Sequence, residues 1–362
     1  MAPASQGPGR SGSPSGARLV ISDILLFAVG ITLLTLGADW LVRGASQLAK
    51  HLGVSHLVIG LTVVAFGTSA PELVVSGSAS MAGEPDVAVG NVMGSTVANV
   101  GLIVGIGALL RPIVVHRRLL VRETPLVILV LTLVMVLSLN GSIGRTDGAI
   151  LLVAFVLYLL FLLKWGGGRL DELAKEVEAE AGVGAAEEED PAVPEASEDA
   201  GEKPPLGFIT SIRARSGTPW NVLQIAIGLP MLLYGAHWLI TSALSLAATF
   251  NVPDEVIAAT MIAVGTSLPE LASTVAAALR GMGDIAIGNV IGSNVFNLGL
   301  VLGTASLLRP LDLSSSLVVS QVLPALIFSI LLIPLALSKE QVGRWEGGFL
   351  LAAYISYVAW IL

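Results

Sequence analysis

Long apolar stretches alternate with short polar segments along almost the whole chain. About 20 predominantly apolar residues are needed for a helix to cross the hydrocarbon core of a bilayer. Stretches of this length occur in two groups, and the sequence therefore predicts ten membrane-spanning helices in two sets of five. Their expected ranges are 19–48, 54–81, 86–110, 119–139, 147–165, 220–248, 254–280, 284–308, 317–337 and 344–362.

The segments outside these helices differ sharply from them in composition. Residues 1–18 are rich in Gly, Pro and Ser, which predicts a disordered N-terminal tail. Residues 166–219 include a long run of acidic residues, Ala and Pro, which is too polar to bury a core and predicts a solvated linker. The expected organisation is a tail at 1–18, a first five-helix repeat at 19–165, a linker at 166–219, and a second five-helix repeat at 220–362.

Composition excludes several classes of protein. Of the 362 residues, 54% are hydrophobic and only 13% are charged, about half the charged fraction of a soluble protein. The net charge of −8 is concentrated in the acidic linker, so nothing indicates nucleic-acid binding. The chain has no cysteine, which excludes disulfides and thiolate metal sites.

The short loops that carry Arg and Lys predict the orientation in the membrane. Four arginines follow the third expected helix, namely Arg111, Arg117, Arg118 and Arg122. Loops rich in Arg and Lys stay in the cytoplasm. We therefore expect an integral protein of the cell (inner) membrane, with both termini outside and the acidic linker in the cytoplasm.

An internal repeat links the two halves. Residues 62–112 align with residues 260–310 without a gap, and about half of the positions are identical. The most similar segments are Gly67–Glu72 with Gly265–Glu270, and Gly90–Ser95 with Gly288–Ser293. Because an odd number of helices separates the copies, the copies have opposite orientations. Inverted repeats with Gly/Pro-interrupted helices at matching positions are typical of transporters with a site near the bilayer midplane.

Each Gly-Thr-Ser-x-Pro-Glu motif lies in the middle of an expected helix, the second or the seventh. Pro and Gly interrupt the helix and free backbone carbonyls. Carbonyl, hydroxyl and carboxylate oxygens together suit a hard cation such as calcium or sodium. Glu72 and Glu270 are the only glutamates deep within the expected helices, where a charge costs about 2.5–3.5 kcal/mol. The alternative is a pair of protonated glutamates that form structural hydrogen bonds.

The third and eighth expected helices carry further polar residues. Ser95 and Asn99 are four residues apart and share a helix face, as do Ser293 and Asn297. Asn91 and Asn289 are either ligands or structural hydrogen-bonding groups, and the sequence leaves both open. We expect Gly90, Gly94, Gly101 and Gly105 to allow close helix packing.

Other charged residues have simpler explanations. Asp86 and Asp284 stand where the third and eighth helices begin, which predicts that they cap them. Asp39 and Arg43 are four residues apart near the end of the first helix, which favours an ion pair.

These motifs resemble the alpha-repeats of the sodium/calcium exchanger family, within the larger cation/calcium antiporter superfamily. The resemblance implies a ten-helix all-α membrane fold, with the second, third, seventh and eighth helices broken around four ion positions and with the first and sixth helices sliding as a unit. It implies the following ligands for calcium and sodium: the carboxylates of Glu72 and Glu270, Thr68 and Thr266, and the carbonyls of Ala65 and Ala263. It further implies Ser69, Ser95, Ser267 and Ser293 as sodium ligands, with Asn99 and Asn297 at the central position.

Two departures separate subfamilies. Potassium-dependent exchangers have an aspartate at the position of Asn297, so we expect no potassium dependence. Proton/calcium exchangers have a Glu-His pair where this chain has Gly94-Ser95 and Gly292-Ser293, which favours sodium over protons.

The expected function is secondary active exchange of sodium for calcium by alternating access, with calcium extrusion driven by sodium entry. A proton-coupled calcium antiporter of the same fold and a passive cation channel are the alternatives. An enzyme is not expected, because no nucleophile is placed beside an activating base. We expect no cofactor and no obligatory protein partner; the bilayer and the transported ions are the partners.

Overall fold

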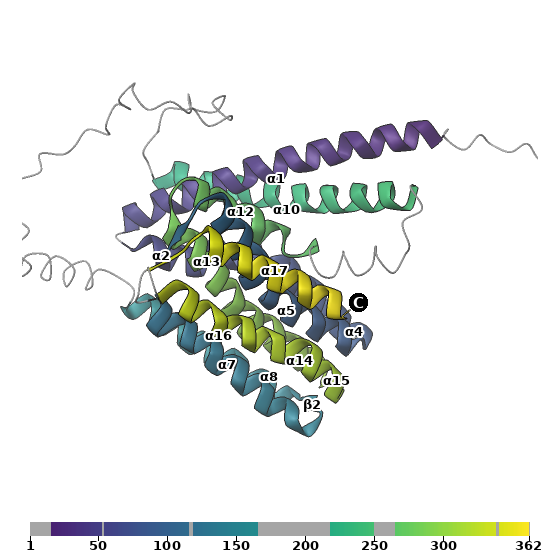
Figure 1. Cartoon of the computed structure of the whole chain (residues 1–362), viewed down its shortest axis with the longest axis vertical. Coiled ribbons are helices and arrows are strands. Elements are labelled where there is room, and N and C mark those ends of the chain that lie inside the picture. The colour runs from purple at the N-terminus through teal and green to yellow at the C-terminus, as the bar shows by residue number, and fades with distance from the viewer. Residues whose placement is uncertain are drawn as a thin grey trace, which may run out of the picture.

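The computed structural model describes residues 16–52, 54–115, 119–165, 218–249, 265–337 and 340–361. The described chain is almost entirely helical and falls into two parts, a long helix pair and a body of packed helices (Figure 1). Nearly all of the expected linker and the first part of the expected seventh helix, 254–264, lie outside the described residues.

The helix pair consists of α1 (Gly16–Leu52) and α10 (Thr218–Thr249), which lie side by side along the top of Figure 1. Glycines spaced seven residues apart form the seam between the two helices. A Cβ atom added to Gly37 would lie 2.4 Å from the backbone nitrogen of Leu232, and one added to Gly235 would lie 2.4 Å from that of Leu34. Only glycine permits backbones to approach this closely, so the seam holds α1 and α10 together as a pair.

The expected second helix is bent in its middle. It consists of α2 (His56–Ile59), η1 (Gly60–Val64), α3 (Ala65–Thr68) and α4 (Ala70–Ala82). The axis turns by 47° between α3 and α4, where Ser69 leaves helical geometry with φ −82° and ψ 6°. Pro71 follows in the first turn of α4, where its missing N–H costs nothing. The bend confirms the predicted break at this motif.

The second copy of the motif has the same local geometry. Helix α12 (Leu268–Leu279) starts after Ser267, which has φ −86° and ψ 3°, and carries Pro269 in its first turn. The repeat in sequence is therefore also a repeat in backbone conformation.

The expected third and eighth helices form the centre of the body. They comprise α5 (Pro85–Ala98), η2 (Asn99–Val104) and α6 (Gly105–Leu110), and α13 (Gly283–Val295), η7 (Phe296–Val301) and α14 (Leu302–Leu308). Each runs as one continuous span that is mostly buried. The expected break takes the form of a π-helical segment, η2 or η7, of the kind often found at functional sites.

The predicted caps of these two helices are wrong. The N-cap positions are Glu84 and Met282, neither of which caps with its side chain. Asp86 and Asp284 lie inside the first turn instead. A carboxylate there still interacts favourably with the positive end of the helix dipole, which explains why acids occur at this place.

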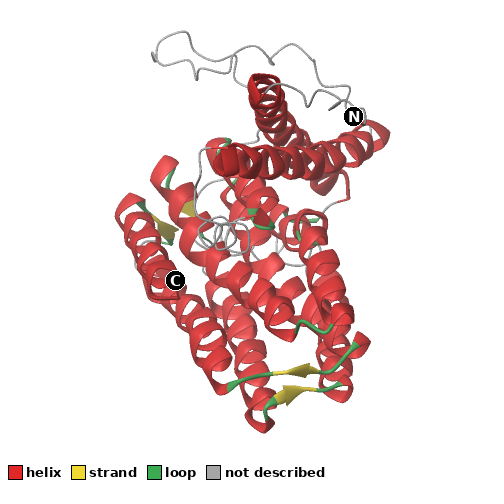
Figure 2. Cartoon of the chain, turned by 90° about the vertical axis from the view of Figure 1, so that its right-hand side faces the viewer, coloured by secondary structure: helices red, strands yellow, loops and turns green. Residues whose placement is uncertain are grey.

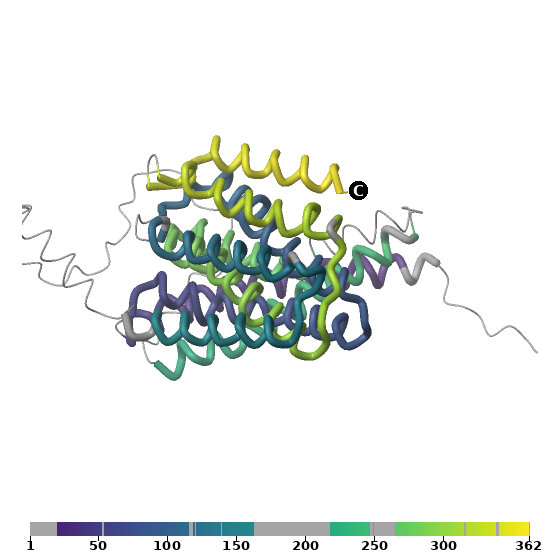
Figure 3. The backbone as a smooth tube through the Cα atoms, turned by 90° about the horizontal axis from the view of Figure 1, so that it is seen from below, coloured from purple at the N-terminus to yellow at the C-terminus, as the bar shows by residue number. Residues whose placement is uncertain are grey.

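The remaining helices flank this centre. They are η3 (Leu119–Glu123), α7 (Thr124–Leu137), η4 (Ser138–Asn140), α8 (Arg145–Trp165), α15 (Ser315–Leu317), η8 (Val318–Val322), α16 (Leu323–Leu337) and α17 (Arg344–Ile361). Helix α8 packs on α14, and α17 packs on α6 and η2. Seen from below, α16 and α17 lie along one edge of the body (Figure 3).

Two short antiparallel sheets join the halves of the chain. Strand β1 (Ile113–Val114) pairs with β4 (Gln341–Val342), and β2 (Ser142–Ile143) pairs with β3 (Leu311–Asp312). Each sheet takes one strand from each half, and α7 separates β1 from β2. Figure 2 shows one of these sheets at the lower end of the body.

Two equivalent arginines, one in each half, each contact a helix end of the other half. Gly83 (φ 85°) and Gly281 (φ 73°) end α4 and α12 in the left-handed conformation that favours glycine. The Arg309 side chain covers Gly83, and the Arg111 side chain covers Gly281. Arg111 also donates a 2.7 Å hydrogen bond to the carbonyl of Leu279, at the C-terminal end of α12. Each repeat thus covers a helix end of the other.

The fold class is that of a polytopic all-α membrane protein, as predicted. Among the described residues, six helices are long and apolar enough to cross a bilayer, and the bent α2–α4 segment makes a seventh. The other three expected spans fall on α7, α12 and α17, which do not meet that criterion on their own within the described ranges. The total of ten stays a prediction.

Candidate functional site

The centre of the candidate site is a pair of buried glutamates at equivalent places in the two repeats. Glu72 lies in the first turn of α4 and is 0% exposed, and Glu270 lies in the first turn of α12 and is 1% exposed. The bends that precede them place both carboxylates at helix N-termini, where unpaired N–H groups favour negative charge. The break in each helix therefore helps to stabilise a charge inside the protein.

Hydroxyl groups connect each carboxylate to its surroundings. Ser69 Oγ donates to Glu270 Oε1 at 3.2 Å, and so links the first motif to the glutamate of the second. Ser95 Oγ donates to Glu72 Oε1 at 3.4 Å, and Ser267 Oγ donates to Ser95 Oγ at 3.3 Å. The predicted residues of the two repeats are therefore interleaved in one site.

The two threonines of the motifs make a reciprocal contact. Thr68 Oγ1 donates to Asn289 Oδ1 at 3.2 Å, and Thr266 Oγ1 donates to Asn91 Oδ1 at 3.1 Å. Thr68 also lies 3.5 Å from the hydroxyl of Ser293. Each hydroxyl thus bridges one repeat to the other.

Asn91 and Asn289 are held by hydrogen bonds at both ends of their amides. Besides accepting from threonine, Asn91 Nδ2 donates to Ser76 Oγ at 2.9 Å. Asn289 Nδ2 donates to Ser273 Oγ and Thr274 Oγ1, both at 3.0 Å. Of the two interpretations that the sequence leaves open, the structure favours structural hydrogen bonding.

Sequence reasoning missed these hydroxyl partners. Ser76 lies one turn after Glu72, and Thr274 lies one turn after Glu270, so each shares a helix face with its glutamate. That spacing was the available signal, because a small hydroxyl residue at membrane depth needs a hydrogen-bonding partner.

Several buried oxygens of the site have no hydrogen-bond partner among the described residues. They are Glu72 Oε2, Glu270 Oε2, Asn99 Oδ1 and Asn297 Oδ1. Buried polar atoms are nearly always satisfied, so unpartnered ones call for an explanation. Carboxylate and amide oxygens such as these are ligand types that a hard cation prefers.

The central asparagines differ in their partners. Asn99 Nδ2 donates to Asn294 Oδ1 at 2.8 Å, whereas neither polar side-chain atom of Asn297 has a hydrogen-bond partner in the described part of the chain. The residue equivalent to Asn294 is Thr96, which instead donates to its own helix at Val92 O. Sequence reasoning missed Asn294; the signal was an amide in the second motif where the first has Thr96.

Of the two alanine carbonyls predicted as ligands, the structure describes one. The Ala65 carbonyl accepts from the Ser69 backbone nitrogen at 3.0 Å and from Thr68 Oγ1 at 3.3 Å, beside the bend. Ala263 lies outside the described residues.

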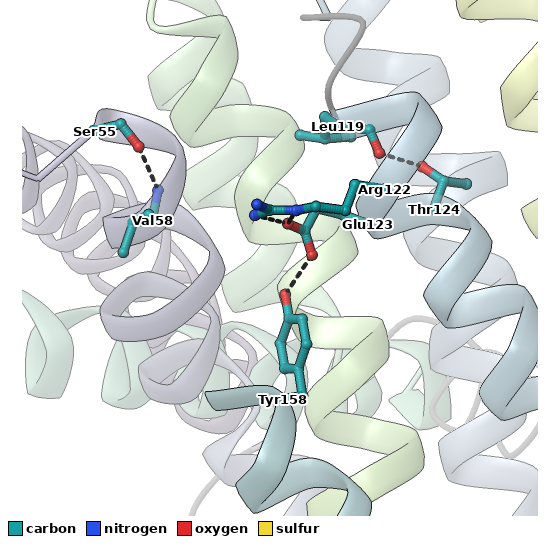
Figure 4. A network of polar contacts seen from close by, with 7 residues as sticks. All are labelled: Ser55, Val58, Leu119, Arg122, Glu123, Thr124 and Tyr158. Carbon is teal, nitrogen blue, oxygen red and sulfur yellow. Dashed lines mark hydrogen bonds and ion pairs between the residues drawn. The ribbon is translucent and has the colours of Figure 1, made fainter. Parts of the chain in front are cut away.

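A third buried glutamate stands apart from the site. Glu123, near the start of its span, is 1% exposed and accepts from Tyr158 Oη at 3.1 Å (Figure 4). Its neighbour Arg122 forms an ion pair with the same carboxylate. In the second half, Tyr357 Oη donates to Gln321 Oε1 at 3.0 Å, and the residue directly before α16, as Glu123 is directly before α7, is the buried Val322. The charge of Glu123 is thus matched within its own cluster.

Two further expectations about packing and charge can be compared with the structure. Asp39 and Arg43 lie 2.9 Å apart and confirm the predicted ion pair, although the geometry is not that of a hydrogen bond; Arg280 also pairs with Asp39. Added Cβ atoms on Gly101 and Gly105 would lie 2.7 Å from Phe328 and 3.1 Å from Gly347, which confirms close packing there.

The same expectation is not met by Gly90 and Gly94 within the described residues. Added Cβ atoms there meet no described atom within 4 Å. The repeat equivalent of Gly94 is Gly292, whose added Cβ would lie 2.7 Å from the Leu61 carbonyl. The residue equivalent to Leu61 is at position 259, outside the described ranges.

Comparison with known proteins identifies relatives over nearly the whole chain. The family model described as "Sodium/calcium exchanger protein" matches residues 22–164 and 220–362. The putative antiporter CaxA of Alkalimonas amylolytica is 39% identical, over 91% of this chain and 95% of the relative. Sodium/calcium exchanger MaX1 of Methanosarcina acetivorans is 32% identical, over 94% and 98%. Inner membrane protein YrbG of Escherichia coli is 34% identical, over 92% and 95%.

Solved structures of the sodium-calcium exchanger NCX_Mj have the same fold. A crystal soaked with 2.5 mM Na⁺ and 0.1 mM Ca²⁺ matches with a TM-score of 0.74 and 31% identity, over 94% of this chain and 98% of that chain. A crystal soaked without either ion gives a TM-score of 0.75.

Proposed function

The chain belongs to the sodium/calcium exchanger family, and from this premise we propose that it exchanges sodium for calcium across a membrane by alternating access. The family consists of transporters, so the chain is a membrane antiporter of this type and not an enzyme. The inner membrane is the proposed location, in keeping with the name of the Escherichia coli relative.

One observation carries the proposal. Glu72 and Glu270 are fully buried, and each keeps one oxygen without a partner among the described residues. Two carboxylates balance the charge of one calcium ion, whereas two isolated charges in the protein interior would be costly. A cation that visits the site from either side satisfies both carboxylates.

The proposed ligands are those that the resemblance to the family implies. We assign calcium and sodium to Glu72 and Glu270, with Thr68, Thr266 and the Ala65 carbonyl as further ligands. The carbonyl of Ala263, which lies outside the described residues, is added as the repeat equivalent of Ala65. Sodium would also bind Ser69, Ser95, Ser267 and Ser293, with Asn99 and Asn297 at the central position. The reciprocal hydrogen bonds between the motifs support this assignment because they gather oxygens from both repeats around the two carboxylates.

Alternating access needs a part that moves as a unit. The α1–α10 pair is suited to this because its glycine seam fixes the two helices to each other. On the body, α1 packs mainly against α12, which carries Glu270. We propose that sliding of the pair opens the site first to one side and then to the other.

The direction and orientation are part of the proposal. The arginines that follow α6 support a cytoplasmic location for that end of the body, because loops rich in Arg and Lys stay in the cytoplasm. Sodium entering from outside would then drive calcium out of the cell, and both termini would lie outside.

A flux assay in sealed vesicles tests the function. Purified full-length protein in proteoliposomes should take up radiolabelled calcium when a sodium gradient is imposed. A potassium gradient alone should produce no uptake. Uptake driven by a proton gradient without sodium would replace this proposal by a proton-coupled antiporter. Single-channel currents in a planar bilayer would indicate a passive channel.

The charges of the site and of its ions predict an electrogenic cycle. Two carboxylates balance one calcium ion or two sodium ions; if a third sodium binds, the loaded site carries a net charge of +1, because position 297 is a neutral asparagine. One charge crossing the membrane is worth about 2.3 kcal/mol per 100 mV, or about a fiftyfold shift in the equilibrium calcium ratio. Calcium efflux at a fixed sodium gradient should therefore accelerate under a valinomycin-imposed inside-negative potential.

The comparison variant for this experiment is Asn297→Asp, which adds a third negative charge to the site. That charge returns with the protein in every cycle, so at the same stoichiometry the equilibrium calcium ratio of the variant should respond to the imposed potential as that of the wild type does. If the flux of the unmodified protein ignores the potential, the exchange is two sodium ions for one calcium and the charge argument fails.

A further inference from the structure

A groove on the flank of the body lies between α1, α6 and α12. It has a volume of about 330 Å³, within the range of ligand pockets, roughly 300–1,000 Å³. Its lining includes Leu34 and Ala38 of α1, Leu110 of α6, and Ala276 and Leu279 of α12. Almost every lining residue is partly or fully exposed, so the groove is open at the surface.

The lining is apolar throughout. Its one side chain with a polar atom is Thr35, whose hydroxyl donates back to the carbonyl of Ile31 in its own helix. The groove therefore offers no hydrogen-bonding group to a polar ligand. A hydrocarbon chain is the ligand that such a lining accepts.

The length of the groove matches one leaflet of a bilayer. It extends along α12 from Leu268 to Leu279, which corresponds to roughly 16 Å of helix. The hydrocarbon core of a bilayer is about 30 Å thick, so one leaflet contributes about 15 Å. An acyl chain lying in the groove would extend from the level of the ion site to one membrane surface.

Positive charge gathers at one end of the groove. Arg111 follows the lining residue Leu110 and donates to the carbonyl of Leu279, and Arg280 follows Leu279. Arg280 pairs with Asp39, which also pairs with Arg43. Arg111, Arg280 and Arg43 thus gather at this end of the groove. Arg111 is exposed, so this end of the groove can contact a charged group at the membrane surface.

We propose that this groove binds one anionic phospholipid, with an acyl chain between α1 and α12 and the phosphate against Arg111 and Arg280. The combination of a basic cluster with an apolar groove between helices is the arrangement that recognises anionic lipid headgroups. The lipid belongs to the leaflet on the arginine-rich side of the protein.

The repeat supplies a matched control position. Arg309 is the repeat equivalent of Arg111 and covers Gly83 as Arg111 covers Gly281. The residue equivalent to Arg280 is Ala82, and the one equivalent to Asp39 is His237. The opposite end of the body thus has the same arginine with no basic residue at the position of Arg280; its other arginine, Arg145, donates to the Leu307 carbonyl. Arg309→Gln is therefore the matched variant.

Native mass spectrometry of the full-length protein tests the proposal, with phosphatidylglycerol and phosphatidylcholine as the two probes. The unmodified protein should retain one phosphatidylglycerol in preference to phosphatidylcholine. Arg111→Gln should weaken phosphatidylglycerol binding about fivefold, since one basic residue near the surface contributes about a fivefold change in lipid affinity. Arg111→Lys and Arg309→Gln should bind as the unmodified protein does.

A second variant tests the groove itself. Ala276→Phe places a ring in the groove and should weaken the binding of both lipids, with thermal unfolding in detergent confirming that the variant is folded. Unchanged lipid binding by folded Ala276→Phe would overturn the proposal. So would equal retention of the two lipids by the unmodified protein, or displacement of the lipid by millimolar inorganic phosphate alone.

Discussion

Glu72→Gln and Glu270→Gln should each abolish calcium exchange and leave the protein folded. Glutamine keeps the volume of the side chain and one acceptor oxygen, so the hydrogen bonds donated by Ser95 and Ser69 can persist. It removes one of the two negative charges that balance the ion. Removing one partner of a buried charge pair costs about 3–5 kcal/mol, which corresponds to at least a hundredfold loss. Calcium flux in proteoliposomes measures it.

The matched control is Glu123→Gln, which removes an equally buried glutamate outside the site. The second half has the neutral Val322 at the equivalent place, and its Tyr357 donates to a glutamine, Gln321, as Tyr158 donates to Glu123. We therefore expect Glu123→Gln to keep a substantial calcium flux. Near-normal flux in Glu72→Gln or Glu270→Gln, with both proteins correctly inserted, would remove that residue from the ion site.

Gly37→Ala and Gly228→Ala should destabilise the protein and reduce calcium flux about tenfold. A Cβ atom on Gly37 would lie 2.4 Å from Leu232 N, and one on Gly228 would lie 2.8 Å from Leu41 N. Overpacking of this kind costs about 1–3 kcal/mol and would push α1 away from α10. Thermal unfolding in detergent and flux in proteoliposomes give the two readouts.

The same substitution at Gly77 in α4 should not destabilise the protein. A Cβ atom there meets only Leu308 Cδ1 at 3.7 Å, an ordinary contact. Alanine is favoured over glycine inside a helix by about 1 kcal/mol, so Gly77→Ala should be neutral or stabilising. If Gly37→Ala unfolds at the same temperature as Gly77→Ala, the seam does not hold the pair together.

Most of the correct predictions about the site came from the internal repeat. Two closely matching motifs in one ungapped register predicted equivalent positions for Glu72 and Glu270, and Pro71 located the bend in the second helix. A local pattern sufficed there, because helix interruption by proline is a local effect.

Contacts between distant segments were beyond the sequence. Asn294 hydrogen-bonds to Asn99, and Thr68 hydrogen-bonds to Asn289. Each bond joins two helices, and the periodicity of a sequence does not tell how one helix is rotated relative to another. The burial of Glu123 was missed for a related reason: its position near the end of a span indicates exposure, and only the packing of Tyr158 against it removes it from water.

The crossed strand pairs bear on how such a molecule could arise. Strand β1 of the first half pairs with β4 of the second, and β2 pairs with β3, while Arg111 and Arg309 each cover the opposite half. Every one of these contacts would also form between two copies of a single half-length chain related by a two-fold axis in the membrane plane. A half-length ancestor inserted in both orientations would therefore have had a ready dimer interface. Gene duplication and fusion would then have freed each half to diverge, as Thr96 and Asn294 have done.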